Sequence, residues 1–145
     1  MKVIIINSPL FREKNVLYDE DSLPPIGLGH IATILHNDGI DVKLIDAVHQ
    51  RISLADLLAT LNALKPDFVA SNIFTTNYEL VKELFEGINF KTHIIIGGLS
   101  TKQLYKDILN WTTNNEIDVV TGDGELITLD IVKNELKESP FHEQG

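Results

Sequence analysis

Residues 93–100 read HIIIGGLS, in which three consecutive isoleucines run directly into two adjacent glycines. An uninterrupted apolar run of this kind is typical of a strand that is buried on both faces, as in a parallel sheet covered by helices on each side. The glycines admit two interpretations. They can serve a strand-to-helix turn that needs unusual backbone dihedrals, or they can leave room for a large molecule lying against the backbone. Taken alone, they favour the turn.

Similar apolar segments alternate with helical patterns along the whole chain. Strands are predicted at Val3–Ile6, Val42–Ile45, Phe68–Ile73, His93–Ile96 and Ile117–Val120. Helical spacing follows each strand, around 31–36, 53–64, 77–88, 101–109 and 125–136, with Ser53 and Asn77 as expected caps. Such alternation gives a parallel sheet, because right-handed crossovers place helices on both faces. We therefore predict an α/β, flavodoxin-like, doubly wound five-stranded sheet of order 2-1-3-4-5.

The length of 145 residues suits one domain with a real core. We assign this domain to residues 1–136. The tail KESPFHEQG (137–145) is polar and contains Pro140, and it is predicted to be a linker or a truncated end.

Composition excludes several functional classes. Twelve Lys and Arg against 21 Asp and Glu give a net charge of −9, and no basic cluster is present to neutralise phosphates or anionic lipid. The absence of cysteine excludes disulfides, thiolate catalysis and an iron–sulfur cluster held by this chain alone. No segment approaches the about 18 apolar residues of a membrane span, and MKVIIINSPL is too weakly apolar for a signal sequence. We expect a cytoplasmic domain with neither nucleic acid nor membrane as a partner.

The candidate site lies in the loops that follow the strands, because the carboxyl ends of parallel strands share one edge of a sheet. These loops are residues 7–29, SNIFTTN (71–77), GGLS (97–100) and TGDGE (121–125). The first is longer than the usual loop of about two to six residues and is expected to be a lid or binding loop. Hydroxyl, amide and bare glycine groups converge there, which suits a large, polar, hydrogen-bonding ligand.

Each feature also has a plain structural interpretation. Residues 122–124 (Gly-Asp-Gly) can form an ordinary turn into a capped helix, and Asp46 with His49 makes only a weak two-ligand metal pattern. No glycine-rich dinucleotide fingerprint or phosphate-binding loop follows the first strand, and no nucleophile elbow is present. The chain is therefore not expected to carry catalysis by itself.

Taken together, four segments carry a resemblance to a known family. They are PPIGLGHIATILHNDGIDVKLIDA (24–47), DFVASNIFTTNYE (67–79), HIIIGGLS and IDVVTGDGE (117–125). They resemble the N-terminal cobalamin-binding domain of cobalamin-dependent radical S-adenosylmethionine enzymes, which typically shows a Pro-Pro/Leu-Gly-Leu first helix, a Gly-Gly after strand four and a Gly-Glu-Gly-Glu after strand five. The resemblance covers about residues 2–136, with Asp123 where Glu is commoner.

The resemblance implies that cobalamin lies on the carboxyl edge, with its dimethylbenzimidazole tail between the sheet and the flanking helices. Ser71, Thr75 and Thr76 would line the tail pocket, residues 97–100 would pack against the nucleotide, and residues 122–125 would contact the polar rim. The implied cofactor-binding set is Asn7, Pro9, Ser71, Thr75, Thr76, Asn77, Gly97, Gly98, Leu99, Ser100, Gly122, Asp123, Gly124 and Glu125. It contains no catalytic and no metal-ligating residue.

Two absences from the sequence bear on function. The loop SPLFREKN lacks the histidine that ligates cobalt in the methyltransferase and mutase branch, so the lower face of cobalt would be unligated by this chain or held by water. Without cysteine, S-adenosylmethionine and the [4Fe–4S] cluster would belong to a downstream radical domain in cis.

Three functions remain open from the sequence. The first is a cobalamin module for methyl transfer or a related anaerobic biosynthesis. The second is a degenerate domain that no longer binds cobalamin and serves interaction or regulation, and the third is a flavodoxin-like fragment using FMN or a nucleotide sugar.

Overall fold

The computed structural model describes residues 1–9, 26–98, 100–121, 128, 131–132 and 141–143. Its core is a six-stranded sheet in the order β2-β1-β3-β4-β5-β6, in which every pair of neighbours is parallel. The strands are β1 (Lys2–Asn7), β2 (Asp41–Asp46), β3 (Phe68–Asn72), β4 (His93–Gly97), β5 (Glu116–Thr121) and β6 (Phe141–Glu143). The predicted fold class and the order 2-1-3-4-5 are confirmed.

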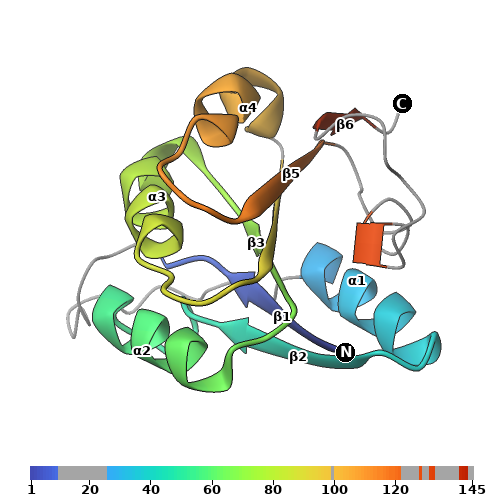
Figure 1. Ribbon diagram of the computed structural model, residues 1–145. Helices are drawn as coiled ribbons and strands as arrows, with labels where there is room; N and C mark the ends of the chain where they lie inside the picture. The colour runs from blue at the N-terminus through green and yellow to red at the C-terminus, as the bar shows by residue number, and fades with distance from the viewer. Residues whose placement is uncertain (10–25, 99, 122–127, 129–130, 133–140, 144–145) are drawn as a thin grey trace.

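Helices cover both faces of the sheet (Figure 1). They are α1 (Ile26–Asn37), α2 (Leu54–Leu64), the 3-10 turn η1 (Thr75–Asn77), α3 (Tyr78–Glu86) and α4 (Thr101–Leu109). Helices α2, α3 and α4 pack on one face and α1 on the other. Residues 128, 131 and 132 are also helical, whereas the rest of the helix predicted at 125–136 lies outside the described residues.

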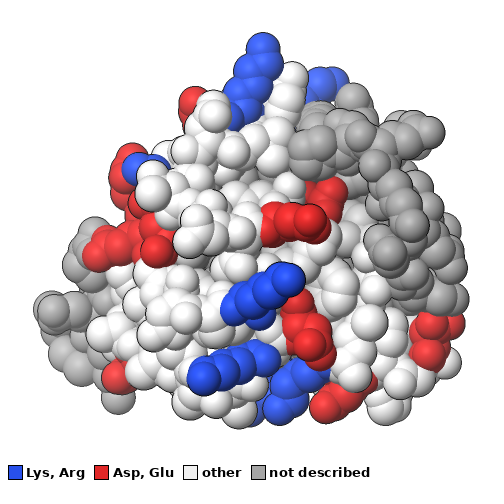
Figure 2. Space-filling view, viewed as in Figure 1, with Lys and Arg blue, Asp and Glu red and all other residues white. Residues whose placement is uncertain are grey.

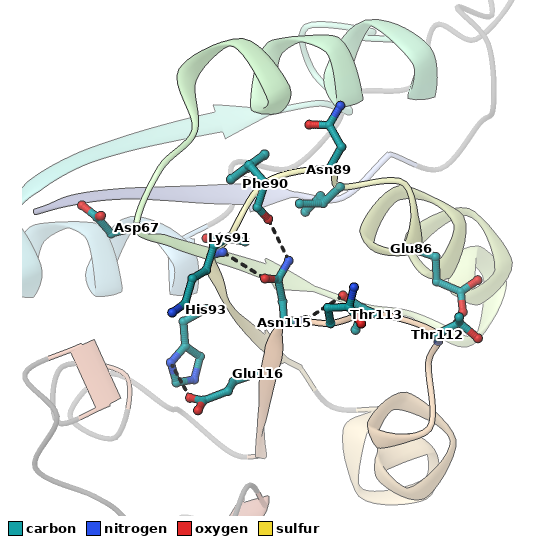
Figure 3. A pocket seen from close by; sticks show the side chains of 13 residues that line it. Asp67, Glu86, Asn89, Phe90, Lys91, His93, Thr112, Thr113, Asn115 and Glu116 are labelled. Atoms are coloured by element: carbon teal, nitrogen blue, oxygen red, sulfur yellow. Dashed lines mark hydrogen bonds and ion pairs between the residues drawn. The ribbon is translucent and has the colours of Figure 1, made fainter.

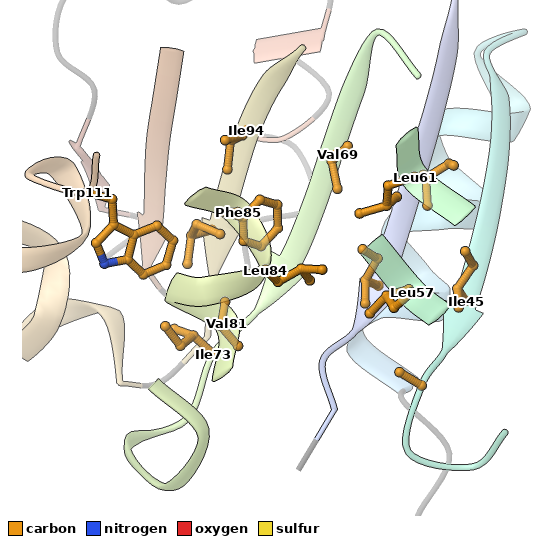
Figure 4. Close-up of a cluster of buried hydrophobic side chains, with 14 of the residues drawn as sticks. Ile45, Leu57, Leu61, Val69, Ile73, Val81, Leu84, Phe85, Ile94 and Trp111 are labelled. Carbon is orange, nitrogen blue, oxygen red and sulfur yellow. The ribbon is translucent and has the colours of Figure 1, made fainter. Parts of the chain in front are cut away.

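The two faces differ in the size of the side chains that they bury. Beneath α2–α4 lies the larger cluster, which includes Phe85, Trp111, Ile94 and Ile96 (Figure 4). The α1 face holds a smaller cluster with Val3, Ile5, Ala70, Ile95 and Val120. Because successive residues of a strand point to opposite faces, β4 sends Ile94 and Ile96 to the first cluster and Ile95 to the second. Both faces of the central strands are therefore buried, as the HIIIGGLS pattern indicated.

Helix α2 begins and ends as local sequence chemistry requires. The Ser53 Oγ accepts a hydrogen bond of 3.1 Å from the Asp56 N–H, which confirms the predicted cap. Lys65 adopts the left-handed conformation (φ 47°) at the other end, and Pro66 follows it. Among the described helices, none combines the length and the apolar character that crossing a membrane requires.

The sixth strand lies in the segment that the sequence analysis assigned to a linker. Residues 141–143 run parallel to β5 and pair with Val119, Val120 and Thr121. The tail thus adds a strand to the sheet, which the linker prediction did not include. The domain boundary after residue 136 stays a prediction.

Charged side chains of both signs are mixed on the face shown in Figure 2. Lys and Arg side chains there lie among Asp and Glu side chains, so this face carries no separate block of positive charge. The whole chain carries a net charge of −9.

Candidate functional site

The candidate site is the carboxyl edge of the sheet, where the strands end in polar residues or in glycine. Asn7 ends β1, Asn72 ends β3, Gly97 ends β4 and Thr121 ends β5. In the register of the sheet, Asn72 lies opposite Gly97. Strand β1 lies between β2 and β3, so the winding direction reverses here, and open α/β sheets bind ligands at this point.

A chain of side-chain amides links the ends of β2, β1 and β3. The Asn7 Nδ2 donates to the Asp46 Oδ1 at 2.8 Å, and the Asn72 Nδ2 donates to the Asn7 Oδ1 at 2.7 Å. The Asn72 Oδ1 in turn accepts from the Ser8 backbone N–H at 2.7 Å. Three strand ends and the start of the long loop are thereby fixed relative to one another. The sequence analysis included Asn7 but missed Asn72.

Asn77 joins the loops after β1 and β3. Its Nδ2 donates to the Ser8 Oγ at 2.8 Å and to the Pro9 carbonyl at 2.9 Å, while its Oδ1 accepts from the Phe74 N–H at 2.8 Å. The side chain is buried, with 1% exposed. Asn77 does stand at the N-cap position of α3, but its side chain makes no capping bond to that helix. Its polar atoms are used within the chain, so Asn77 positions the two loops.

Asp46 and His49 form a turn and show no metal geometry. The Asp46 Oδ1 accepts both from Asn7 and from the His49 backbone N–H at 3.0 Å. Within the described part of the chain, no group of three or more His, Cys, Asp or Glu side chains could hold a metal ion. Asp46 is therefore best explained as a turn residue.

Gly98 is required by the protein's own backbone. Its φ is +126°, a conformation that residues with a side chain rarely adopt. A Cβ on Gly98 would also lie 3.2 Å from the Ile73 carbonyl oxygen. The buried Thr101 Oγ1 donates to the Gly98 carbonyl at 2.7 Å and to the Val120 carbonyl at 3.0 Å, which holds this turn against β5. The turn interpretation of the glycine pair is correct for Gly98.

Within the described part of the chain, Gly97 has no such internal reason. Its φ is outside the left-handed region, and a Cβ there would meet only the Val120 carbonyl oxygen at 3.6 Å, an ordinary contact. By alternation along β4 from Ile95, this Cβ would point to the α1 face. On the neighbouring β3, Ala70 lies on the same face, and alternation along the strand places Asn72 there too. We call Ala70, Asn72 and Gly97 the α1-side strip. It is low in side-chain volume, and it reaches the carboxyl edge at Gly97.

The remaining predicted residues divide into three groups. Ser71 is buried, and its Oγ donates to the Asn72 carbonyl at 2.9 Å, so this hydroxyl satisfies the strand end. Thr75 and Thr76 are exposed in η1, and Ser100 is part-exposed before α4. Leu99, Gly122, Asp123, Gly124 and Glu125 lie outside the described residues.

A separate hollow of about 1080 Å³ lies at the opposite, amino edge of the sheet (Figure 3). Its walls are the segments 86–93 and 112–116 with Asp67. Asn115 ties the two segments together, since its Nδ2 donates to the Phe90 carbonyl and its Oδ1 accepts from the Thr92 N–H, both at 3.1 Å. The hollow is thus remote from the strand ends that carry Asn7, Asn72 and Gly97.

Comparisons with known proteins give one family model and several solved structures of similar fold. A family model described as the B12 binding domain matches residues 15–132. Among solved structures, the cobalamin-dependent S-adenosylmethionine radical enzyme OxsB, with aqua-cobalamin and S-adenosylmethionine bound, matches 94% of this chain at 17% identity and a TM-score of 0.72. The radical S-adenosylmethionine methyltransferase TsrM from Kitasatospora setae, with tryptophan substrate and a SAM analogue bound, matches 92% at 16% identity and a TM-score of 0.72. No curated protein matches.

These structural likenesses show the fold. The chain spans 19% of the OxsB chain and 25% of the TsrM chain, so it corresponds to one part of each.

Proposed function

The chain belongs to the family of B12 binding domains, and we propose that it is the cobalamin-binding module of a radical S-adenosylmethionine enzyme, without catalytic activity of its own. The observation that carries the proposal is Gly97. Nothing in the described chain requires a glycine there. A Cβ at this position would point to the α1 face, next to the carboxyl edge of the sheet. A bound molecule lying against this backbone explains why the position carries no side chain.

The residues at the edge fit the cofactor class that the family assignment confirms, which is cobalamin. The α1-side strip would receive the nucleotide tail beside Gly97, and the exposed hydroxyls of Thr75 and Thr76 would meet polar groups of the cofactor. Asn7 and Asn77 would act by holding the loops in place. Leu99, Ser100 and residues 122–125 remain proposed contacts. Bound cobalamin supplies a cobalt centre for methyl transfer or related chemistry.

The proposal includes a second domain in cis, as the resemblance implies. Because β6 runs parallel to β5 and pairs Glu143 with Thr121, it leads the chain to the carboxyl edge. A domain that followed in cis would start at the edge of the proposed site. Such a domain would hold S-adenosylmethionine and the [4Fe–4S] cluster, since this chain has no cysteine. The proposed boundary after residue 136 rests on the extent of the resemblance alone, since β6 places residues 141–143 in the same sheet.

Gel filtration with hydroxocobalamin tests the proposal. We expect the pink colour to elute with the protein, and Gly97→Val to abolish its retention because the added methyl groups fill the strip. Urea unfolding of both proteins provides the control, since Gly97→Val should leave the fold intact. If the unsubstituted protein, the parent, elutes as a colourless peak at saturating hydroxocobalamin, the proposal is wrong.

A second candidate is a degenerate interaction or regulatory module that has lost cobalamin. The observation that favours it is the lack of histidine in residues 7–29, where related domains carry the cobalt ligand. This candidate predicts no uptake by the parent and full tolerance of bulk at Gly97. Bulk at Gly98 does not distinguish the two functions, because Gly98 is fixed by the contact with Ile73.

A further inference from the structure

Phe74 is the one large aromatic side chain that the described part of the chain leaves well exposed. The exposed large hydrophobic residues are Met1, Leu44 and Phe74, at 66%, 37% and 41%. Met1 is the chain end and Leu44 lies within β2. Phe74 instead follows β3 at the carboxyl edge, two residues beyond Asn72. An aromatic ring left in water at a proposed binding site is a surface that a ligand can cover favourably.

The direction of the Phe74 side chain follows from the backbone. The Ile73 N–H donates to the Gly97 carbonyl at 3.0 Å, which continues the ladder between β3 and β4 by one residue. Phe74 itself is extended, with φ −122° and ψ 158°. Ile73 is wholly buried in the cluster beneath α2–α4. Alternation therefore places Phe74 on the other side, the side of Asn72 and Gly97, where the α1-side strip opens.

The Phe74 backbone is also held in place. The Asn77 Oδ1 accepts from the Phe74 N–H at 2.8 Å, and the Asn77 N–H donates to the Phe74 carbonyl at 3.2 Å. Asn77 is buried and anchored to Ser8 and Pro9. Because this backbone is already fixed, a ligand that covers the ring does not have to order the turn, which favours binding.

We infer that Phe74 is an apolar wall for the benzimidazole end of the cobalamin nucleotide tail, at the mouth of the α1-side strip. The inference rests on the proposed function. Benzimidazole is the flat aromatic part of the cofactor, and aromatic pairs attract beyond the area that they bury. The corrin carries polar amide groups around its rim and gains less from a phenyl ring. Phe74 therefore contributes to the preference for cobalamin over corrinoids without a tail.

The test compares two probes, hydroxocobalamin and diaquacobinamide, which has the corrin without the nucleotide tail. We expect Phe74→Ala to weaken cobalamin binding about ten-fold, the effect of one lost aromatic contact. Its affinity for cobinamide should stay within about two-fold of the parent. Leu44→Ala is the matched control, because it removes a similarly exposed apolar side chain from β2. Its affinities for cobalamin and for cobinamide should both equal those of the parent. The midpoint of urea unfolding is measured for every variant.

The outcomes separate the inference from the proposed function. A parent that binds no cobalamin overturns both. A parent that binds, with unchanged affinity in Phe74→Ala, overturns the inference alone. Equal losses for cobalamin and cobinamide in a folded variant overturn the assignment to the tail. If Phe74→Ala does not fold, Phe74→Leu carries the same comparison, since it keeps apolar bulk and removes only the aromatic face.

Discussion

Gly97 and Gly98 are neighbours in sequence and occupy the same strand-to-helix turn, yet the structure gives them different reasons to be glycine. At Gly98 the fold itself requires glycine. Its φ is +126°, and a Cβ there would lie only 3.2 Å from the Ile73 carbonyl oxygen. At Gly97 the described residues leave room for one, with the nearest contact at 3.6 Å. The difference shows that two adjacent glycines can differ in what the surrounding backbone requires of them. Substitutions at the two glycines and at the side chains around them test that division.

Gly98→Ala should be the most destabilising of the substitutions considered. A residue forced into this backbone region and against Ile73 costs about 2–3 kcal/mol of unfolding free energy. Urea unfolding measures the loss. Gly39→Ala is the control for backbone strain alone, because Gly39 also has a positive φ (+83°) but nothing lies within 4 Å of its Cβ position. If Gly98→Ala and Gly39→Ala lose the same unfolding free energy, the contact with Ile73 does not add to the cost at Gly98.

Asn77→Ala should destabilise by about 2 kcal/mol, because it leaves buried hydrogen-bonding groups of both loops without a partner. Thermal or urea unfolding gives the value. Asn62→Ala is a matched control, since the Asn62 Oδ1 accepts one exposed bond from the Asn89 N–H. A loss at Asn77 no greater than at Asn62 would contradict its role in joining the loops.

Thr101→Val should cost about 1 kcal/mol, because the hydroxyl that holds Gly98 to β5 is replaced by a methyl group of similar size. Thr101→Ser keeps the hydroxyl and should recover most of the stability lost through the hydrogen bonds. If Val and Ser behave alike in urea unfolding, the two bonds do not secure the turn.

Gly97→Ala should change the unfolding free energy least, by no more than about 1 kcal/mol. Any change should be stabilising, because glycine within a strand is less stable than alanine. The same unfolding measurement applies. A loss as large as that of Gly98→Ala would show that Gly97, too, is required by the fold.

The sequence predicted the sheet well and the site only in outline. Each of the five predicted strands agrees with β1 to β5 within one residue at either end, because strands buried on both faces read as continuous apolar runs. The apolar spacing at 31–36 marks only the later turns of α1, which begins at Ile26, because Gly27 and Gly29 weaken the helical pattern in its first turns. Strand β6 was missed because FHE is short and only partly apolar.

The site depends on quantities that a sequence does not carry. Asn72 pairs with Asn7 only because β1 and β3 lie side by side in one register, so no local pattern marks it. The division between Gly97 and Gly98 depends on a dihedral angle and on the approach of Ile73. Phe74 could have been found by extending the alternation of β3 beyond its predicted end, since it follows Asn72 at a spacing of two.

The most direct test of the account measures cobalamin affinity and unfolding free energy together, for the parent and for Gly97→Val. We expect the parent to bind hydroxocobalamin and the variant to lose binding, while their unfolding free energies agree within about 1 kcal/mol. The claim is that position 97 carries no side chain because cobalamin lies against it. It would be contradicted if Gly97→Val bound cobalamin as well as the parent does, or if the parent did not bind cobalamin.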